Sequence, residues 1–220
     1  MLFTFPGVRL SLRLAVLALL TARPMTGFDL MRQFDSSVGY LWSAPHTQIY
    51  PELKKLEQAG LVKGEDVQRG TRGTKRLYSI TGDGIAAFRE MVSRVEEPRR
   101  DRDPWRLKAS YLEWADPAAA RAQLVAHLEY FQAAEAFYRQ HRDDLLARTV
   151  PLLRDRLEHV PPDQQDAVVE FKAFAYAGVI RRARAEIDWA REGIALLDRL
   201  ARESSDSDAV AAAAAAAVSP

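Results

Sequence analysis

Apolar residues recur at steps of three and four along the first part of the chain, and this spacing predicts three short helices. The first begins near Ser11 and must end before Pro24, because a residue that precedes proline avoids helical torsion angles. Thr26 is a suitable N-cap for the second, which we expect to stop near Gly39. The third ends at Gly60, a residue type that closes helices in a left-handed conformation. Three closely linked helices predict a helix-turn-helix core.

The third helix has an apolar face and a polar face. Its apolar face holds three residues at helical spacing: Ile49, Leu53 and Leu56. Pro51 lies inside this pattern, where proline removes one helical hydrogen bond. The helix therefore either begins at Thr47 or Gln48, or kinks at the proline.

A glycine-rich basic segment follows, flanked by two short apolar strands. Leu61-Val62 supplies the first strand and residues 77–80 supply the second. Glycines between them allow a sharp turn, so we expect a β-hairpin wing. Four basic residues lie at or near its tip: Arg69, Arg72, Lys75 and Arg76. Thr81 then caps a fourth helix, which completes a winged helix-turn-helix.

The second half of the chain predicts long helices only. Residues 96–104 are charged, contain two prolines and lack apolar periodicity, so they form a linker between a domain at 1–95 and a helical domain at 105–203. Asp116-Pro117 is typical of a helix start and opens a long helix. Residues 204–220 have no apolar face to pack, and we expect a flexible, alanine-rich tail.

The last long helix, from Pro161-Pro162-Asp163 to about Glu203, carries a coiled-coil seam. The seam alternates steps of three and four: Ile180, Ala183, Ile187, Ala190, Ile194 and Leu197. A helix of this length buries such a seam fully only against another chain, so these residues predict a homodimer. The expected fold is mainly α with a small β-wing, an N-terminal winged helix-turn-helix followed by a long-helix dimerisation domain.

Composition and charge exclude some classes of function and favour another. The chain has no cysteine, which excludes disulfides, thiolate zinc sites and a cysteine nucleophile. Its net charge of +1 conceals a basic N-terminal part, where Lys and Arg outnumber Asp and Glu, and an acidic remainder. A basic helix-turn-helix indicates nucleic-acid binding. No apolar run approaches the roughly 18 residues that a membrane span needs, and we expect a cytoplasmic protein.

The polar face of the third helix holds residue types that suit DNA contact. Glutamine pairs with adenine, threonine contacts a thymine methyl group, and tyrosine or lysine binds phosphate. The candidates are His46, Thr47, Gln48, Tyr50, Pro51, Lys54 and Lys55. An ordinary solvated helix face is the alternative, but the basic wing favours DNA.

The sequence contains no motif for catalysis and no motif for metal binding. The four histidines lack a metal-ligand spacing, and no phosphate-binding loop or nucleophile elbow is present. We therefore expect no metal, no cofactor and no enzyme. Aromatic residues in the C-terminal half are typical of core packing, and a pocket for a small aromatic effector is the less favoured alternative. Its candidate residues are Trp105, Trp114, Tyr130 and Tyr138.

Two sequence motifs resemble the PadR family of bacterial transcriptional regulators. The first is His46-Thr-Gln-Ile-Tyr-Pro-Glu-Leu-Lys-Lys-Leu-Glu-Gln-Ala-Gly-Leu-Val62, followed by a basic hairpin and Lys75-Arg-Leu-Tyr-Ser-Ile-Thr81. The second is Pro24-Met-Thr-Gly-Phe-Asp-Leu30. The similarity is close over residues 11–94, and beyond them it extends only to the pattern of long helices in the family's larger members.

The resemblance implies a homodimer that places two winged helices on a pseudopalindromic DNA operator. It implies a repressor, often of its own promoter or of a neighbouring gene, and release of DNA by phenolic or drug-like ligands in some members. By the family's pattern Gln48 and Tyr50 lie on the recognition helix, and Arg72, Lys75 and Arg76 on the wing. A winged-helix module that binds proteins and serves as a scaffold is the alternative function.

Overall fold

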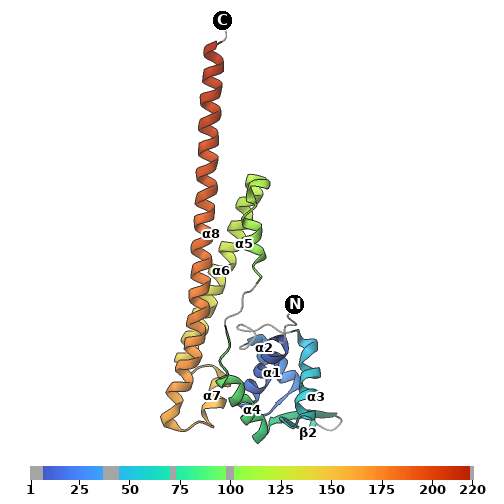
Figure 1. The fold of residues 1–220 in the computed structure, drawn as a ribbon. Coiled ribbons are helices and arrows are strands. Elements are labelled where there is room, and N and C mark those ends of the chain that lie inside the picture. The colour runs from blue at the N-terminus through green and yellow to red at the C-terminus, as the bar shows by residue number, and fades with distance from the viewer. Residues whose placement is uncertain (1–6, 37–44, 70–72, 98–101, 219–220) are drawn as a thin grey trace. The chain divides into compact units, whose positions relative to one another are not determined.

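Helices make up most of the chain, as a computed structural model shows (Figure 1). The structure describes residues 7–36, 45–69, 73–97 and 102–218. The chain forms two compact units, one of Met1–Pro98 with Arg148–Val169 and one of Arg99–Ala147 with Glu170–Pro220. Mainly helical structure with one small sheet confirms the expected fold class.

The first unit contains a winged helix-turn-helix. Its elements are α1 (Gly7–Leu20), β1 (Met25–Thr26), α2 (Gly27–Ser36), the 3₁₀ turn η2 (His46–Gln48), α3 (Ile49–Gln58), β2 (Val62–Arg69), β3 (Gly73–Ile80) and α4 (Gly82–Ser93). The strands form an antiparallel sheet in the order β1-β3-β2. Strand β1 was not predicted, because two residues that pair only with β3 leave no periodic signal in the sequence.

The apolar faces of α1, α2 and α3 form the core of this unit. Ile49, Leu53 and Leu56 are fully buried in it, which confirms the predicted inner face of the third helix. Both predicted caps are present as well. The Thr26 hydroxyl accepts a hydrogen bond from the Asp29 amide at 3.1 Å, and the Thr81 hydroxyl accepts one from the Gly84 amide at 3.0 Å. These caps fix where α2 and α4 begin.

Asp29 completes the cap of α2 and makes the stability of this helix depend on pH. Its carboxylate accepts hydrogen bonds from the Thr26 hydroxyl at 2.7 Å and the Thr26 amide at 3.1 Å, and the bond from the hydroxyl lowers the pKa of Asp29. The pKa of Asp29 is lower in the folded protein than in the unfolded chain. The charged carboxylate therefore stabilises the fold fully at a pH above the ordinary aspartate pKa, and this stabilisation is lost as the pH falls through the pKa of the folded state.

We therefore expect Asp29→Asn to lower the free energy of unfolding by about 1 kcal/mol near pH 7. The difference from the wild type should shrink as the pH falls below the ordinary aspartate value of 3.8. Urea denaturation at several pH values measures this difference. A constant difference from pH 7 to pH 3 would show that the Asp29 charge has no part in the cap.

A short helix that the sequence analysis missed, α7 (Pro151–Leu157), packs onto α1. Leu152 joins the core, and the Arg156 guanidinium donates to the Ala18 carbonyl at 2.7 Å and to the Thr21 hydroxyl at the end of α1. Burial of this guanidinium lowers the pKa of Arg156. Residues 148–169, expected within the helical domain, thus belong to the compact unit of the winged helix.

The second unit is built on two antiparallel helices, α6 (Pro117–Leu146) and α8 (Pro162–Val218), the second of which begins in the first unit. Two short elements precede them, α5 (Pro104–Ala109) and η3 (Leu112–Trp114). Asp116 caps α6 through two backbone amides, as predicted. The His127 ring lies 3.1 Å from the buried Glu186 carboxylate, which joins α6 to α8.

Two expectations about α8 are wrong. Ile180, Ala183, Ile187 and Ala190 are buried within the single chain, on the part of α8 that bonds to α6 through Arg184 and Glu186, so the chain itself covers most of the predicted dimer seam. Ile194 and Leu197 are half-buried. The helix also continues to Val218 through the supposed tail, because alanine is the best helix former and no glycine or proline interrupts residues 204–218. None of the helices that the structure describes is long and apolar enough to cross a membrane.

Candidate nucleic-acid interface

The turn η2 and helix α3 hold most of the predicted DNA contacts, and those whose side chains are described are exposed. The α-helix begins at Ile49, which places Pro51 in its first turn. The first four backbone amides of a helix have no acceptor within the helix, so proline costs no hydrogen bond there. The α-helix thus begins one residue later than the start at Thr47 or Gln48 given by the first alternative, and those two residues belong to the 3₁₀ turn η2 instead.

Gln48 lies at the N-cap of α3 with its side chain free. It is exposed, makes no capping bond, and forms no side-chain hydrogen bond among the residues that the structure describes. Thr47, Pro51 and Lys54 are exposed beside it at helical spacing. A free amide group on an exposed helix start suits a bidentate pair with an adenine edge in the major groove.

The two lysines of this face differ in their surroundings. Lys55 Nζ lies 3.8 Å from Glu52 Oε2, and Glu52 is a buried carboxylate that Arg13 Nε also contacts at 3.2 Å. Lys54 has no ion pair among the described residues. The full charge of Lys54 is therefore available to a phosphate, whereas that of Lys55 is partly neutralised by Glu52.

Tyr50 is half exposed and its ring lies against the first residue of α2. A Cβ atom on Gly27 would be 2.4 Å from Tyr50 Cε1, so only glycine allows this contact. The ring is thus held between α3 and α2 with 51% of the residue exposed. A tyrosine in this position is oriented by packing, which suits a hydroxyl that binds a phosphate.

On the wing, Arg76 binds its own chain. Arg76 Nη2 lies 2.6 Å from Glu57 Oε1 and Arg76 Nη1 lies 3.2 Å from Asp66 Oδ1, and the bond to Glu57 is the main reason that the pKa of Arg76 is raised. Glu57 also accepts a bond from the Gly64 amide at 3.0 Å. Arg76 therefore joins α3 to both wing strands, whereas Lys75 beside it is exposed.

Three predicted DNA contacts lie outside what the structure describes. Arg72 is in the undescribed segment 70–72, and the side chains of His46 and Arg69 are likewise not described. The described members are all exposed, and leaving aside Arg76, whose charge is paired with Glu57 and Asp66, they are Thr47, Gln48, Tyr50, Pro51, Lys54, Lys55 and Lys75. We call this set the α3–wing surface.

The four aromatic candidates for an effector pocket do not come together in one place. Trp105 lies edge-on to His127 at 5.2 Å between ring centroids, and Tyr138 lies 6.4 Å from Tyr176. Tyr130 contacts its neighbour in sequence, Phe131. Trp114 is 86% exposed at an open apolar hollow beside α5. The predicted set is thus spread over the second unit.

Each half of the chain matches the model of a known protein family. The model of the transcriptional regulator PadR-like family matches residues 16–90, and the model named virulence activator alpha C-term matches residues 102–198. The chain belongs to the PadR-like family of transcriptional regulators. This confirms the family that the motifs resemble.

This PadR-like chain is similar to the negative transcriptional regulator PadR of Bacillus subtilis, with 27% identity over 189 residues, which are 86% of this chain and 98% of that protein. The structure of that PadR with operator DNA has a TM-score of 0.66 at 24% identity and covers 84% of this chain and 98% of its own. The structure of the same PadR with p-coumaric acid has a TM-score of 0.62 at 24% identity, and the match covers 88% of this chain and 99% of that one. The structure of the virulence activator AphA of Vibrio cholerae has a TM-score of 0.61 at 25% identity, and the match covers 86% of this chain and 99% of that one.

Sequence reasoning missed the acidic residues that organise this PadR-like surface. Glu52 binds Arg13 on α1 and lies near Lys55, and Glu57 binds Arg76 on β3. Each of these arginines is distant along the chain, and nothing in the local pattern of α3 indicates either pairing. The basic wing and the polar face of α3 were evident from sequence, but the ion pairs that orient them were not.

Lys75 and Arg76 of the PadR-like wing are neighbours with different expected roles. We expect Lys75→Ala to weaken binding to every DNA duplex and to lower the slope of log affinity against log salt by about one. We expect Arg76→Ala to leave that slope close to the wild-type value, since its charge is already paired with Glu57 and Asp66. Titrations of labelled duplex at four salt concentrations measure both slopes. Equal losses of slope would show that Arg76 also contacts phosphate.

Proposed function

We propose that the chain is a sequence-specific DNA-binding repressor that acts as a homodimer on a pseudopalindromic operator. The observation that carries this proposal is the free Gln48 amide at the exposed start of α3, flanked by the unpaired Lys54 and by the wing. The Bacillus subtilis relative supports it, since that protein is a negative transcriptional regulator whose structure has been determined with operator DNA.

The roles within the α3–wing surface follow from its chemistry. Thr47 and Gln48 would contact base edges in the major groove and set the sequence preference. Lys54, Lys55, Tyr50 and Lys75 would bind phosphates and set the affinity and its dependence on salt. Binding DNA in this way needs no cofactor. The proposal also includes a cytoplasmic location and no enzymatic activity.

We further propose that a small aromatic effector releases the DNA. The structure of the Bacillus subtilis relative with p-coumaric acid supports an effector of this class. Aromatic side chains of the second unit, among them Trp105 beside His127 and Trp189, offer stacking surfaces for such a ligand. A hydroxylated aromatic acid is therefore the first probe for this response.

The test compares duplex DNA from upstream of the protein's own gene with scrambled DNA of equal length at two salt concentrations. We expect tight binding to the upstream duplex to survive the higher salt while binding to scrambled DNA collapses, and p-coumaric acid or a related phenolic acid to release the upstream duplex. Equal, salt-labile binding to both duplexes would contradict sequence-specific recognition. Unchanged affinity across a broad panel of aromatic acids would contradict the effector.

A scaffold that binds another protein remains the alternative function. The exposed apolar residues of α5 and η3 favour it, since Leu107 is 65% and Trp114 is 86% exposed. Binding to a protein through this patch would be insensitive to salt, whereas binding to DNA is steeply weakened by it. Absence of DNA binding at either salt concentration would favour the scaffold.

A further inference from the structure

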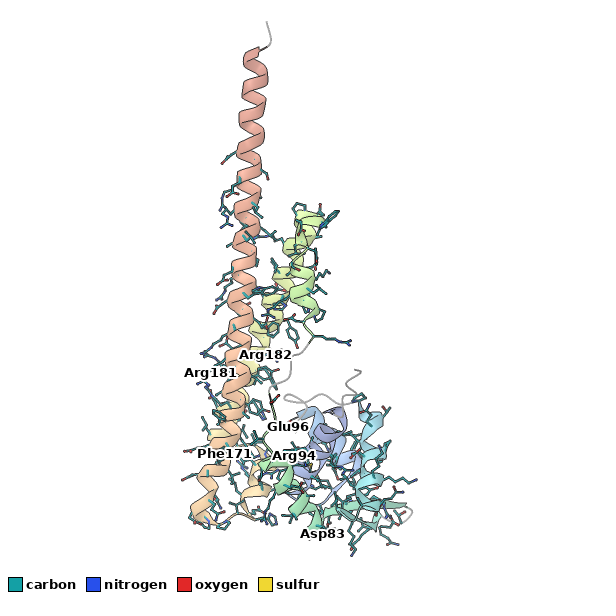
Figure 2. All side chains as sticks on the ribbon, in the orientation of Figure 1. Asp83, Arg94, Glu96, Phe171, Arg181 and Arg182 are labelled. Atoms are coloured by element: carbon teal, nitrogen blue, oxygen red, sulfur yellow. The ribbon has the colours of Figure 1, made fainter. Side chains whose placement is uncertain are left out.

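The wing is joined to helix α3 first at its base. The Leu61 amide donates to the Leu56 carbonyl at 2.9 Å, and the Thr81 hydroxyl donates to the Gly60 carbonyl at 2.7 Å. These bonds fix where β2 leaves α3 and where β3 ends beside it. Figure 2 draws the side chains of this region and labels Asp83 at the start of α4, which follows β3. A hairpin attached only at its base can still swing about that base, so its direction needs a second attachment.

Glu57, in the last turn of α3, makes this second attachment. Its Oε1 atom accepts a hydrogen bond from the Gly64 amide of β2 at 3.0 Å and another from Arg76 Nη2 of β3 at 2.6 Å. Arg76 Nη1 lies 3.2 Å from Asp66 Oδ1, which joins the two strands to each other. One carboxylate therefore holds both wing strands against the helix. We call Glu57, Gly64 and Arg76 the wing clamp.

The residue types of the wing clamp fit this close approach. A Cβ atom on Gly64 would lie 2.5 Å from Glu57 Oε1 and 2.5 Å from Arg76 Nε, so only glycine lets β2 come this near to the carboxylate. The Arg76 guanidinium also lies 6.0 Å from the centroid of the Tyr78 ring, and Tyr78 is buried in the core. The guanidinium is thus bound on several sides by its own chain.

The outer part of the wing extends beyond the wing clamp. Val67 pairs with Lys75 next to the clamp, and the register continues to Arg69 and Gly73. None of the side chains described in this outer part bonds to α3. Within the described residues, the wing clamp is therefore the outermost attachment to α3, and it sets where Lys75 lies relative to the exposed face of that helix.

We propose that Glu57 is a positioning residue for DNA binding. It contacts no DNA itself, and it holds the outer wing where Lys75 and the exposed residues of α3 meet one duplex together. This inference rests on the proposed DNA-binding function and adds to it a residue outside the α3–wing surface. A wing already held in place loses no freedom on binding, whereas a loose wing must be ordered by the DNA at the expense of affinity.

The negative charge of Glu57 makes the direction of its effect decisive. A carboxylate on a DNA-binding helix repels phosphates, and this one also neutralises part of the charge of Arg76. By charge alone, its removal should strengthen DNA binding and steepen the dependence on salt. Positioning predicts the opposite direction, because loss of the attachment frees the wing.

We expect Glu57→Ala to weaken binding to duplex DNA from upstream of the protein's own gene by about 10-fold at each salt concentration, with a parallel salt slope. The slope stays the same because Lys75 still binds phosphate once the wing is ordered on the DNA. Glu57→Gln removes the same charge but keeps an oxygen that accepts both hydrogen bonds, so we expect a loss of no more than about threefold. Equal or tighter binding by Glu57→Ala would overturn the proposal.

Glu65 offers a matched removal of charge from the wing. Its carboxylate lies 2.5 Å from Lys63 Nζ on the same strand, so Glu65→Gln frees a cation without touching an attachment to α3. We expect this variant to bind the upstream duplex as tightly as the wild type or slightly more tightly. A loss equal to that of Glu57→Ala would show that charge on the wing, and not attachment to α3, sets the affinity.

Removal of the basic residues of the outer wing tests whether Glu57 acts through the wing. In a protein with Arg69, Arg72 and Lys75 all changed to alanine, we expect Glu57→Ala to cost less than about twofold, since the outer wing then has no basic residue to place. A full 10-fold loss in that background would show that Glu57 acts on α3 itself, and would overturn the proposal.

Spin labels test the attachment without DNA, because the chain has no cysteine of its own. Thr74→Cys on the wing and Gln58→Cys at the end of α3 provide exposed positions for two labels. With labelled protein diluted in unlabelled protein, electron paramagnetic resonance measures the distance within one chain. We expect one narrow distance distribution with Glu57 present and a broader one after Glu57→Ala. Identical distributions would overturn the wing clamp.

The outcomes separate this inference from the proposed function. A wild-type protein that binds the upstream duplex specifically, together with a Glu57→Ala variant that binds it equally well, would overturn the role of Glu57 while the repressor stands. A wild-type protein that binds no duplex specifically would contradict the repressor and, with it, the role of Glu57 in DNA binding. The spin-label distances would then still decide whether Glu57 holds the wing.

Discussion

Replacing Gln48 with alanine is expected to weaken binding to the operator about 10- to 100-fold and to relax the base preference at one position of each half-site. The side chain is exposed at the start of α3, makes no bond within the described part of the chain, and has no part in the core. The loss should therefore appear in DNA binding and not in stability. Titration of the operator and of its single-base-pair variants measures both the loss and the change in preference.

Lys54→Ala is the matched control for this prediction. Its charge is free but carries no base-specific hydrogen-bond pattern, so we expect all duplexes to lose affinity alike and the salt slope to fall by about one. If Gln48→Ala showed this same uniform loss with its base preference intact, the role assigned to Gln48 would be wrong. The two variants thus separate specificity from affinity on one helix face.

Replacing Gly84 with alanine is expected to destabilise the winged-helix unit by about 2 kcal/mol or more. A Cβ atom there would lie 2.0 Å from the Leu61 carbonyl oxygen and 2.8 Å from an Ile80 side-chain carbon, so backbone must move to admit it. The same residue donates the capping bond to Thr81, and a shift of α4 would weaken that bond too. Chemical denaturation followed by circular dichroism measures the loss.

Gly82→Ala is the control at the start of the same helix. A Cβ atom on Gly82 meets nothing within 4 Å, so we expect no loss of stability, and a small gain from the better helix former. Equal stabilities of the two variants would contradict the close approach of α4 to the turn at Leu61.

The parts of the fold that sequence predicts well are those that local chemistry decides. The caps at Thr26 and Thr81 and the buried face of α3 depend on residues within one or two turns, and each is present as predicted. Helix α7 was missed although Pro151 and its leucines give a local signal for a short helix. Strand β1 has no such signal, since its pairing partner lies on β3.

Periodicity failed for α8 because it shows that a face is buried without showing what buries it. The seam through Ile180 and Ala190 has the spacing of a dimer interface, but α6 supplies its partner within the chain. The same limit applies to the wing. The sequence shows that Arg76 is a cation near the tip, and only the fold brings Glu57 and Asp66 to it. Burial partners and ion pairs between distant elements are set by tertiary packing.

Enrichment of bound duplexes from a random pool shows whether the exposed start of α3 recognises DNA sequence. We expect the wild-type protein to select a pseudopalindrome whose half-sites lie about one helical turn, roughly 34 Å, apart. We expect Gln48→Ala to select the same arrangement with one position of each half-site relaxed. A pool that stays random after repeated selection, or the same site from both proteins at equal stringency, would contradict recognition by Gln48.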